Sequence, residues 1–126
     1  MNDLDAAAHL SRRRTLIERA LEERLPSADE EPRRIHEAMR YATLGAGKRL
    51  RPMLVLEVGA MADTARDAYL DAACALEFVH TASLILDDLP SMDDAALRRG
   101  TPATHTAFGE ATAVLASLAL VAMAFD

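Results

Sequence analysis

The sequence contains few of the residues that favour β-strands. Its 126 residues include five valines, three isoleucines and five aromatic side chains, none of which is tryptophan. Alanine and leucine, which favour helices, occupy 26 and 18 positions. This composition excludes an all-β sandwich or barrel and predicts an all-α fold.

The sequence also lacks paired cysteines, a positive net charge and a long apolar run. Cys74 is the single cysteine, so an internal disulfide is excluded and a reducing cytoplasm is the expected compartment. A net charge of -6 argues against a nucleic-acid partner. Residues 1–5 are acidic, unlike a secretory signal, and the apolar stretch 113–125 is too short to span a bilayer. We therefore expect a cytoplasmic protein with no transmembrane segment.

Apolar residues recur at helical spacing in five segments. The first predicted helix covers about 10–25, and the second runs from a capping signature of Ser27 and Glu30 to Gly45. The third predicted helix has Pro52 in its first turn and runs to about 62, and the others run from 67 to 88 and from 104–106 to 125, with a loop at 63–66. Residues 1–126 form a single domain portion without an internal repeat or linker.

The fourth and fifth predicted helices are apolar on nearly every side. Such helices are normally buried inside a larger bundle, and the five predicted helices are too few to surround one another. Nothing in the sequence covers the apolar residues that lead up to position 125, and their exposure would favour association or a molten state. We therefore expect the chain to be the N-terminal part of a larger helical bundle.

The strongest candidate site is the acidic segment 87–94, in which four aspartates follow an apolar helix. In an unbroken helix Asp87 and Asp93 would be about 600° apart. Both can therefore face one target only if Pro90 breaks the helix. Carboxylates without a neighbouring histidine or cysteine favour Mg2+, which takes further ligands from water and phosphates. The alternative is a solvated acidic turn that caps the helix.

Basic residues lie on both sides of the acidic segment in the sequence. Lys48 and Arg51 are three residues apart and share one face of a helix start, where free N–H groups also favour an anion. Arg98 and Arg99 are adjacent, so their side chains point apart and could serve two anions. The alternative is a solvated face, or salt bridges to the nearby aspartates. If the acidic and basic clusters converge in the fold, they favour a binding site for a magnesium diphosphate. Carboxylates without the metal would repel the diphosphate anion.

His80 precedes Asp87 and Asp88 by seven and eight residues and therefore shares their face of the helix. In this position it could donate a hydrogen bond to a phosphate. The alternative is a buried histidine that is bonded to a backbone carbonyl.

Four motifs keep the order and spacing of a known family. They are G-K-R-L-R-P at 47–52, H-T-A-S-L-I-L-D-D-L-P-S-M-D-D at 80–94, L-R-R-G at 97–100, and T-H with F-G-E at 104–110. Over about 38–125 the chain resembles the N-terminal half of bacterial trans-isoprenyl diphosphate synthases, and especially the geranylgeranyl diphosphate synthases of carotenoid pathways. The resemblance implies an all-α bundle of the isoprenoid-synthase type with a central cavity, and a homodimer.

The resemblance also implies two groups of site residues. The residues that would hold Mg2+ and the allylic diphosphate are Asp87, Asp88, Asp93 and Arg98. The residues that would bind isopentenyl diphosphate are Lys48, Arg51, His80 and Arg99. The implied reaction is a head-to-tail prenyl transfer. In it the allylic C–O bond ionises, the isopentenyl double bond attacks the carbocation, and a proton is lost.

Several alternatives to a geranylgeranyl diphosphate synthase remain open. They are a farnesyl or longer polyprenyl diphosphate synthase, a non-catalytic subunit of a heteromeric synthase, a terpene cyclase and an acidic helical interaction module. A cyclase does not need the second diphosphate site that Lys48, Arg51 and Arg99 provide. The family's second aspartate-rich motif does not occur in these residues, so the 126-residue chain is expected to be inactive alone.

Two small residues precede the acidic segment where a growing product would extend. Ser83 and Ala82 lie four and five positions before Asp87, about one turn away at a rise of ~1.5 Å per residue. The resemblance implies that an aromatic side chain here stops growth at fifteen carbons, so small residues predict a twenty-carbon product. The alternative is that both residues only permit close packing against a neighbouring helix.

Overall fold

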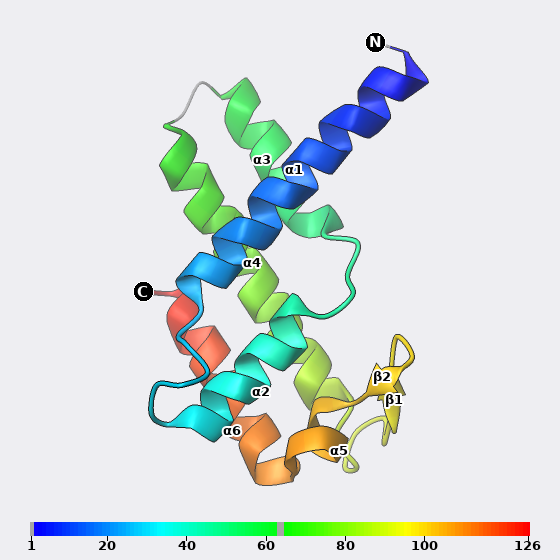
Figure 1. Cartoon of the computed structure of the whole chain (residues 1–126), viewed down its shortest axis with the longest axis vertical. Helices are drawn as coiled ribbons and strands as arrows, with labels where there is room; N and C mark the ends of the chain where they lie inside the picture. The colour runs from blue at the N-terminus through cyan, green and yellow to red at the C-terminus, as the bar shows by residue number, and fades with distance from the viewer. Residues whose placement is uncertain (1, 63–64) are drawn as a thin grey trace.

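The computed structural model describes residues 2–62 and 65–126 and shows an almost entirely helical chain (Figure 1). The elements are, in order, α1 (Asp3–Arg24), α2 (Arg33–Leu44), α3 (Leu50–Met61), α4 (Arg66–Asp87), β1 (Leu97–Arg98), β2 (Thr101–Pro102), α5 (Thr104–Phe108) and α6 (Glu110–Ala124). The predicted all-α class is confirmed. The predicted loop at 63–66 lies partly outside the described residues, because positions 63 and 64 are not described.

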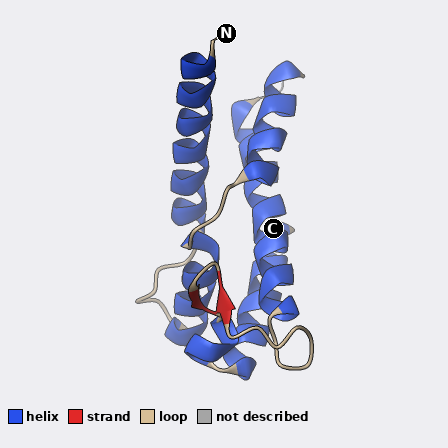
Figure 2. Cartoon of the chain, turned by 90° about the vertical axis from the view of Figure 1, so that its right-hand side faces the viewer, coloured by secondary structure: helices blue, strands red, loops and turns tan. Residues whose placement is uncertain are grey.

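Helix α4 runs through the middle of the bundle, with α3 and α6 packed against it and α1 crossing over it (Figures 1 and 2). Its residues 68–87 are long and apolar enough to cross a membrane by length and composition alone. In this fold the same helix is the one that contacts α1, α2, α3 and α6. The apolar character of α4 is therefore explained by its central place.

One stripe of α4 supplies much of the apolar core. Its buried members are Cys74, Phe78, Ala82 and Ile85, which recur at helical spacing. They belong to one cluster with buried residues of α1, α3 and α6, namely Ile17, Leu21, Leu56, Ala116 and Leu120. Burial raises the pKa of the Cys74 thiol to about 11, so this thiol is protonated and unreactive.

Two predicted helix starts are wrong. Helix α1 begins at Asp3 rather than near 10, because the Asn2 side chain accepts a hydrogen bond from the Asp5 backbone N–H at 2.9 Å and caps the helix. The Ser27 and Glu30 signature does not start α2. Ser27 instead closes a turn, in which its carbonyl accepts from the Glu30 N–H at 3.2 Å, and α2 begins only after Pro32.

The single helix predicted from 104–106 to 125 is also wrong, because it is divided in two. Gly109 separates α5 from α6 with a φ of 90°, a backbone conformation that residues with a Cβ rarely adopt. Before α5, the segment predicted as a polar connection contains a short antiparallel hairpin in which Leu97 pairs with Pro102. The predicted ends at Gly45 and at position 88 are confirmed to within a residue.

Gly59 allows α3 to approach α4 closely. A Cβ atom at this position would lie 2.7 Å from Tyr69 Cδ1 and closer still to Cβ and Cγ of the same side chain. We expect Gly59→Ala to lower the free energy of unfolding by about 1–3 kcal/mol, although alanine is the better helix former. Urea denaturation measures the loss. The same change in a Tyr69→Ala background should cost less, and equal losses in both backgrounds would contradict the close contact.

Candidate functional site

The acidic segment folds back on the end of α4. After the helix ends at Asp87, the Asp93 N–H donates to the Asp87 carbonyl at 2.9 Å, and the Ala95 N–H donates to the Asp88 carbonyl at 3.1 Å. The predicted break of the helix around Pro90 is therefore confirmed. The turn returns the backbone of Asp93 to that of Asp87, which a continuous helix could not do.

The three predicted metal ligands have different surroundings. Asp88 has a side chain that is 4% exposed, and both of its oxygens accept hydrogen bonds from Arg98, at 2.6 Å from Nε and 2.7 Å from Nη2. Asp87 and Asp93 are exposed, and no described residue donates a hydrogen bond to their carboxylates. Asp88 can therefore offer a metal only the lone pairs that Arg98 leaves free.

Arg98 lies in the field of all three carboxylates. Its hydrogen bond to Asp88, together with the nearby charges of Asp88, Asp87 and Asp93, outweighs partial burial and raises the pKa of its guanidinium. The salt bridge to a nearby aspartate, which was one interpretation of the basic residues, is thus present for Arg98.

The donor chemistry around the turn suits a magnesium ion. Asp87 and Asp93 offer exposed carboxylate oxygens, and neither histidine nor cysteine stands beside them. Within residues 2–62 and 65–126, no three acidic, histidine or cysteine side chains are arranged to hold a metal by themselves. Mg2+ commonly takes only one or two protein carboxylates and completes its shell with water and phosphate oxygens. The predicted ligands therefore fit a metal that arrives with a phosphate ligand.

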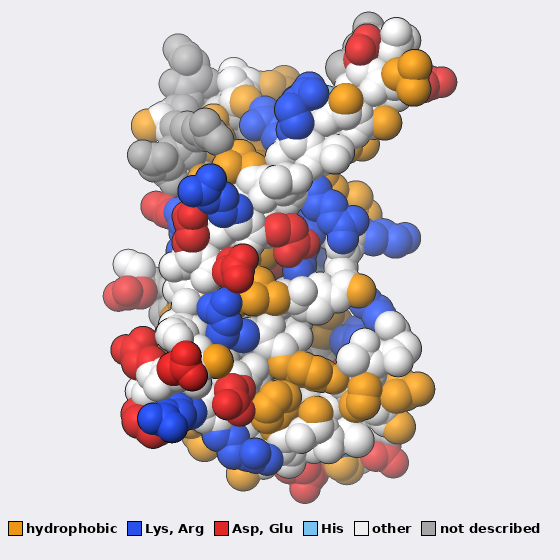
Figure 3. Space-filling model, in the orientation of Figure 1, with side chains coloured by type: hydrophobic (Ala, Val, Ile, Leu, Met, Phe, Trp, Pro, Cys, Tyr) orange, Lys and Arg blue, Asp and Glu red, His pale blue; other side chains and the backbone are white. Residues whose placement is uncertain are grey.

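A second feature is a basic cavity of about 160 Å³ at the start of α3. Its lining includes all four residues predicted to bind isopentenyl diphosphate, namely Lys48, Arg51, His80 and Arg99, together with Arg49, Leu50 and Glu77. Lys and Arg side chains also gather along the right-hand side of Figure 3, beside the loop between α2 and α3. The fold thus brings together residues that are up to 51 positions apart, from Lys48 to Arg99.

His80 contacts Arg51 inside this cavity. Its Nε2 lies 3.2 Å from Arg51 Nη1, and because a guanidinium can only donate, Nε2 accepts the hydrogen bond. Partial burial and then the charge of Arg51 lower the pKa of His80, so the ring is neutral at neutral pH. The alternative of a histidine ring bonded to a backbone carbonyl is not what the structure shows, since the ring contact is with Arg51.

The two arginines of the β1–β2 hairpin point in different directions. Arg98 pairs with Thr101, which leaves Arg99 and Gly100 as a two-residue turn with φ values of 52° and 78°. Positive φ at both positions is typical of a tight hairpin turn. Arg98 points to Asp88, whereas Arg99 donates to the Ala46 carbonyl in the loop between α2 and α3. The predicted divergence of the two side chains is confirmed.

A larger cavity of about 310 Å³ lies between α2, α4 and the hairpin. Asp88 and Arg98 line it together with apolar residues that include Leu44, Leu84 and Ile85. Four residues line both cavities: Arg49, Glu77, His80 and Arg99. The basic cavity and the acidic turn are therefore connected through a shared wall.

The hairpin is held against α2 by Tyr41. Its hydroxyl donates to the Pro102 carbonyl at 2.7 Å, and its ring packs edge-on against Phe108 at a centroid distance of 5.2 Å. Arg34 also donates to the Phe108 carbonyl at 2.8 Å. These contacts fix the position of the hairpin that carries Arg98 and Arg99, and the motifs in the sequence do not predict them.

Ala82 and Ser83 lie outside both cavities. Ala82 is buried in the core with 1% of its surface exposed. Ser83 is exposed, and its hydroxyl donates to the His80 carbonyl at 2.7 Å. Their role in product length stays a prediction.

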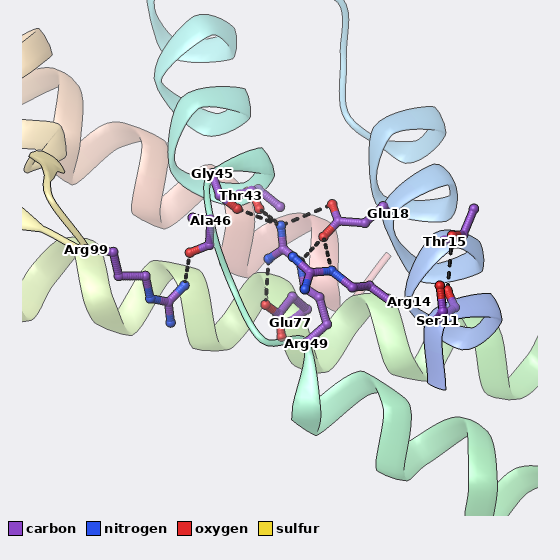
Figure 4. Close-up of polar contacts among 10 residues, drawn as sticks. All are labelled: Ser11, Arg14, Thr15, Glu18, Thr43, Gly45, Ala46, Arg49, Glu77 and Arg99. Atoms are coloured by element: carbon purple, nitrogen blue, oxygen red, sulfur yellow. Dashed lines mark hydrogen bonds and ion pairs between the residues drawn. The ribbon is translucent and has the colours of Figure 1, made fainter. Parts of the chain in front are cut away.

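Sequence reasoning missed two buried charges beside the site, Arg49 and Glu77, which form an ion pair at 2.9 Å (Figure 4). The exposed fractions of their side chains are 2% and 7%. A carboxylate within an apolar helix such as α4 needs a buried cationic partner. Glu77 was therefore a signal that one of the nearby basic residues points inward.

Comparison with known proteins identifies the family of this chain. The sequence profile of the polyprenyl synthetases matches residues 32–126. The chain belongs to the polyprenyl synthetase family. The predicted resemblance to isoprenyl diphosphate synthases is thereby confirmed at the level of the family.

Individual relatives agree with this assignment. The chain is 51% identical over 110 residues to the heterodimeric geranylgeranyl pyrophosphate synthase large subunit 2 of Arabidopsis thaliana, covering 87% of this chain and 29% of the relative. An FPP/GFPP synthase from Zymomonas mobilis superposes with a TM-score of 0.89 at 44% identity, over 97% of this chain and 44% of that structure. A geranyltransferase from Legionella pneumophila superposes with a TM-score of 0.88 at 39% identity, over 94% and 41%.

The chain spans about a third of the length of the curated relatives that it matches. The matched part carries both the basic cavity and the acidic turn.

The contact between His80 and Arg51 leads to a titration prediction. Arg51→Gln removes one of the positive charges that lower the pKa of His80, so this pKa should rise part of the way toward its ordinary value. Partial burial, the larger cause, would remain. NMR titration of the His80 ring measures the change. Arg19→Gln, on the exposed face of α1, is the control and should leave the titration unchanged. An unaltered His80 pKa in Arg51→Gln would contradict the contact.

Proposed function

We propose that the protein carrying this chain is a magnesium-dependent prenyltransferase that condenses an allylic diphosphate with isopentenyl diphosphate to form geranylgeranyl diphosphate. The observation that carries the proposal is the basic cavity beside the acidic turn, with His80 and Arg99 in the lining of the cavities on both sides. Two substrates that each end in a diphosphate need two such charged sites within reach of one another. Relatives named geranylgeranyl pyrophosphate synthases support the choice of product.

The basic cavity has the charge to bind a diphosphate without a metal. Lys48, Arg51 and Arg99 are cationic, and His80 can take up a proton when an anion replaces its contact with Arg51. A unit-charge pair ~4 Å apart is worth about 4 kcal/mol at an effective dielectric of 20. We therefore assign isopentenyl diphosphate to this cavity.

The acidic turn has the opposite charge and would repel a bare diphosphate. Asp87, Asp88 and Asp93 would hold Mg2+, which when bound neutralises the allylic diphosphate and the negative charge that develops as this group departs. Arg98 stands beside them, oriented by Asp88, and can contact the same diphosphate. Breaking the allylic C–O bond leaves both electrons on the departing diphosphate. The isopentenyl double bond then attacks the cation, and the diphosphate accepts the proton that is lost.

We also propose a homodimer as the assembly, which the resemblance to isoprenyl diphosphate synthases implies. The exposed apolar residues Leu115 and Leu118 on α6 (50% and 59% exposed) and Phe125 beyond it (84% exposed) are assigned to contacts with the rest of the bundle. A non-catalytic subunit of a heteromeric synthase is the second candidate, because one relative is named as a heterodimeric large subunit. The complete set of aspartates at 87–94 favours the catalytic role.

Substitution of the aspartates tests the reaction in the protein made from the complete reading frame. Asp87→Ala and Asp88→Ala should each lower turnover by orders of magnitude, because each removes stabilisation of the departing charge and neither removes core packing. Prenyl transfer from radiolabelled isopentenyl diphosphate is the assay, with and without chelation of Mg2+. Asp29→Asn, at an exposed carboxylate that lines neither cavity, is the control. Full activity in Asp87→Ala would overturn the proposal.

Product length is tested at the two small residues of α4. Ala82→Phe should shift the product from twenty to fifteen carbons, but Ala82 is buried, so overpacking is expected to cost about 1–3 kcal/mol. Ser83→Phe is the better-tolerated variant because Ser83 is exposed. Chromatography of the dephosphorylated products gives the chain length. A twenty-carbon product from both variants, with stability lost only in Ala82→Phe, would mean that these residues serve packing alone.

A further inference from the structure

Arg49 stands in the motif that binds the anion but points away from it. Its neighbours Lys48 and Arg51 are exposed at the basic cavity, whereas the Arg49 side chain is 2% exposed. Figure 4 shows Arg49 pointing between Glu18 and Glu77. Its backbone has a φ of 55°, in the left-handed region, at the residue before α3. Residues with a Cβ hold this conformation only where their surroundings enforce it.

Hydrogen bonds on three sides of the guanidinium hold Arg49 in this conformation. Nε donates to Glu18 Oε1 of α1 at 2.7 Å, and Nη1 donates to Glu77 Oε1 of α4 at 2.9 Å. Nη2 donates to the Thr43 carbonyl at 2.6 Å and to the Gly45 carbonyl at 3.1 Å, where α2 ends. One side chain thus joins α1, α4 and the end of α2 to the loop that leads into α3.

The Glu77 contact fixes the loop relative to the rest of the basic cavity. Glu77 lies three residues before His80 on α4, so the two lie on neighbouring parts of one helix face. On the other side, a Cβ at Gly47 would lie 2.9 Å from Arg99 Nη1 and 3.2 Å from Arg49 Nη1. The glycine therefore lets both guanidinium groups approach the same point of the loop.

We infer that Arg49 is a positioning residue for the basic cavity. It fixes residues 45–51 against α4, and in this position Lys48 and Arg51 face His80 and Arg99. This inference rests on the proposed function insofar as the cavity binds a diphosphate. Glu18 and Glu77 neutralise the buried guanidinium, so it adds little attraction for the anion itself. Its contribution is the spacing of the groups that contact the anion.

The first measurement needs no ligand. The pKa of His80, followed by NMR in the protein made from the complete reading frame, responds to burial of the ring and then to the charge of Arg51, and the other charges that act on the ring are Glu77, Arg99 and Arg98. Arg49→Lys keeps the charge but loses the planar set of donors. It should release the loop, move Arg51 from His80 and raise the pKa of His80 toward its ordinary value.

The second measurement is calorimetric titration with inorganic diphosphate. Arg49→Lys and Arg49→Met should raise the Kd at least about tenfold, which corresponds to about 1.4 kcal/mol, at a temperature where circular dichroism shows both folded. Arg24→Met is the matched control, since Arg24 also joins α1 to α4, through Asp71, but lines neither cavity. It should lower the unfolding temperature and leave both the Kd and the His80 titration unchanged.

The outcomes separate the positioning role of Arg49 from the assignment of a diphosphate to the basic cavity. A folded Arg49→Lys variant with the original His80 pKa overturns the positioning role, whether or not the chain binds diphosphate. If the unsubstituted chain binds no diphosphate while the His80 pKa moves as expected, the positioning role stands and the diphosphate assignment fails. Should both Arg49 variants unfold, Glu77→Gln applies the same two tests with the shape of the side chain retained. Because Glu77→Gln also removes a charge that raises the pKa of His80, a lower His80 pKa together with an unchanged Kd in that variant overturns the role.

Discussion

Burial of one face of α4 is the constraint on which the rest of the structure depends. Phe78, Ala82 and Ile85 pack into the core with residues of α1, α3 and α6, and this contact sets the rotation of the helix about its axis. Glu77 lies about 100° or less around the helix from this apolar stripe, and Asp88 follows the last residue of the helix. The rotation of α4 therefore also places these two carboxylates beside the cavities. The positions of the charged groups are therefore a consequence of packing among uncharged ones.

Internal pairing decides which charges remain available to ligands. Asp88 is held by Arg98, and Arg49 is held by Glu18 and Glu77, so these charges are satisfied within the protein. Removing one partner of the buried Arg49–Glu77 pair costs far more than the pair itself contributes, since the remaining charge is left without compensation. The exposed aspartates of the turn and the exposed cations of the cavity are the groups that external ions can reach.

The two charged regions are kept apart by the shape of the backbone. Positive φ at Arg99 and Gly100 reverses the hairpin, so one of its arginines serves the acidic turn and the other serves the loop before α3. If both arginines pointed to Asp88, the basic cavity would lose a cation and the acidic turn would be over-neutralised. A tight turn thus separates the acidic turn from the basic cavity.

The grouping of Lys48, Arg51, His80 and Arg99 was implied by the family resemblance, and the packing of the helices brings these residues together. The sequence by itself determined the helical class, the ends of α2 and α4 and the break around Pro90. These depend on local properties, namely side-chain period, backbone restriction and motif spacing, which act within a few residues. Tertiary structure alone decided that Asp88 differs from Asp87, and that Arg49 is buried against Glu77, which is 28 residues away. It also decided the break at Gly109, where one glycine in an otherwise helical pattern is compatible with either outcome. The physical reason is that the pairing of charges depends on distances between segments, and only the packing of the helices sets those distances.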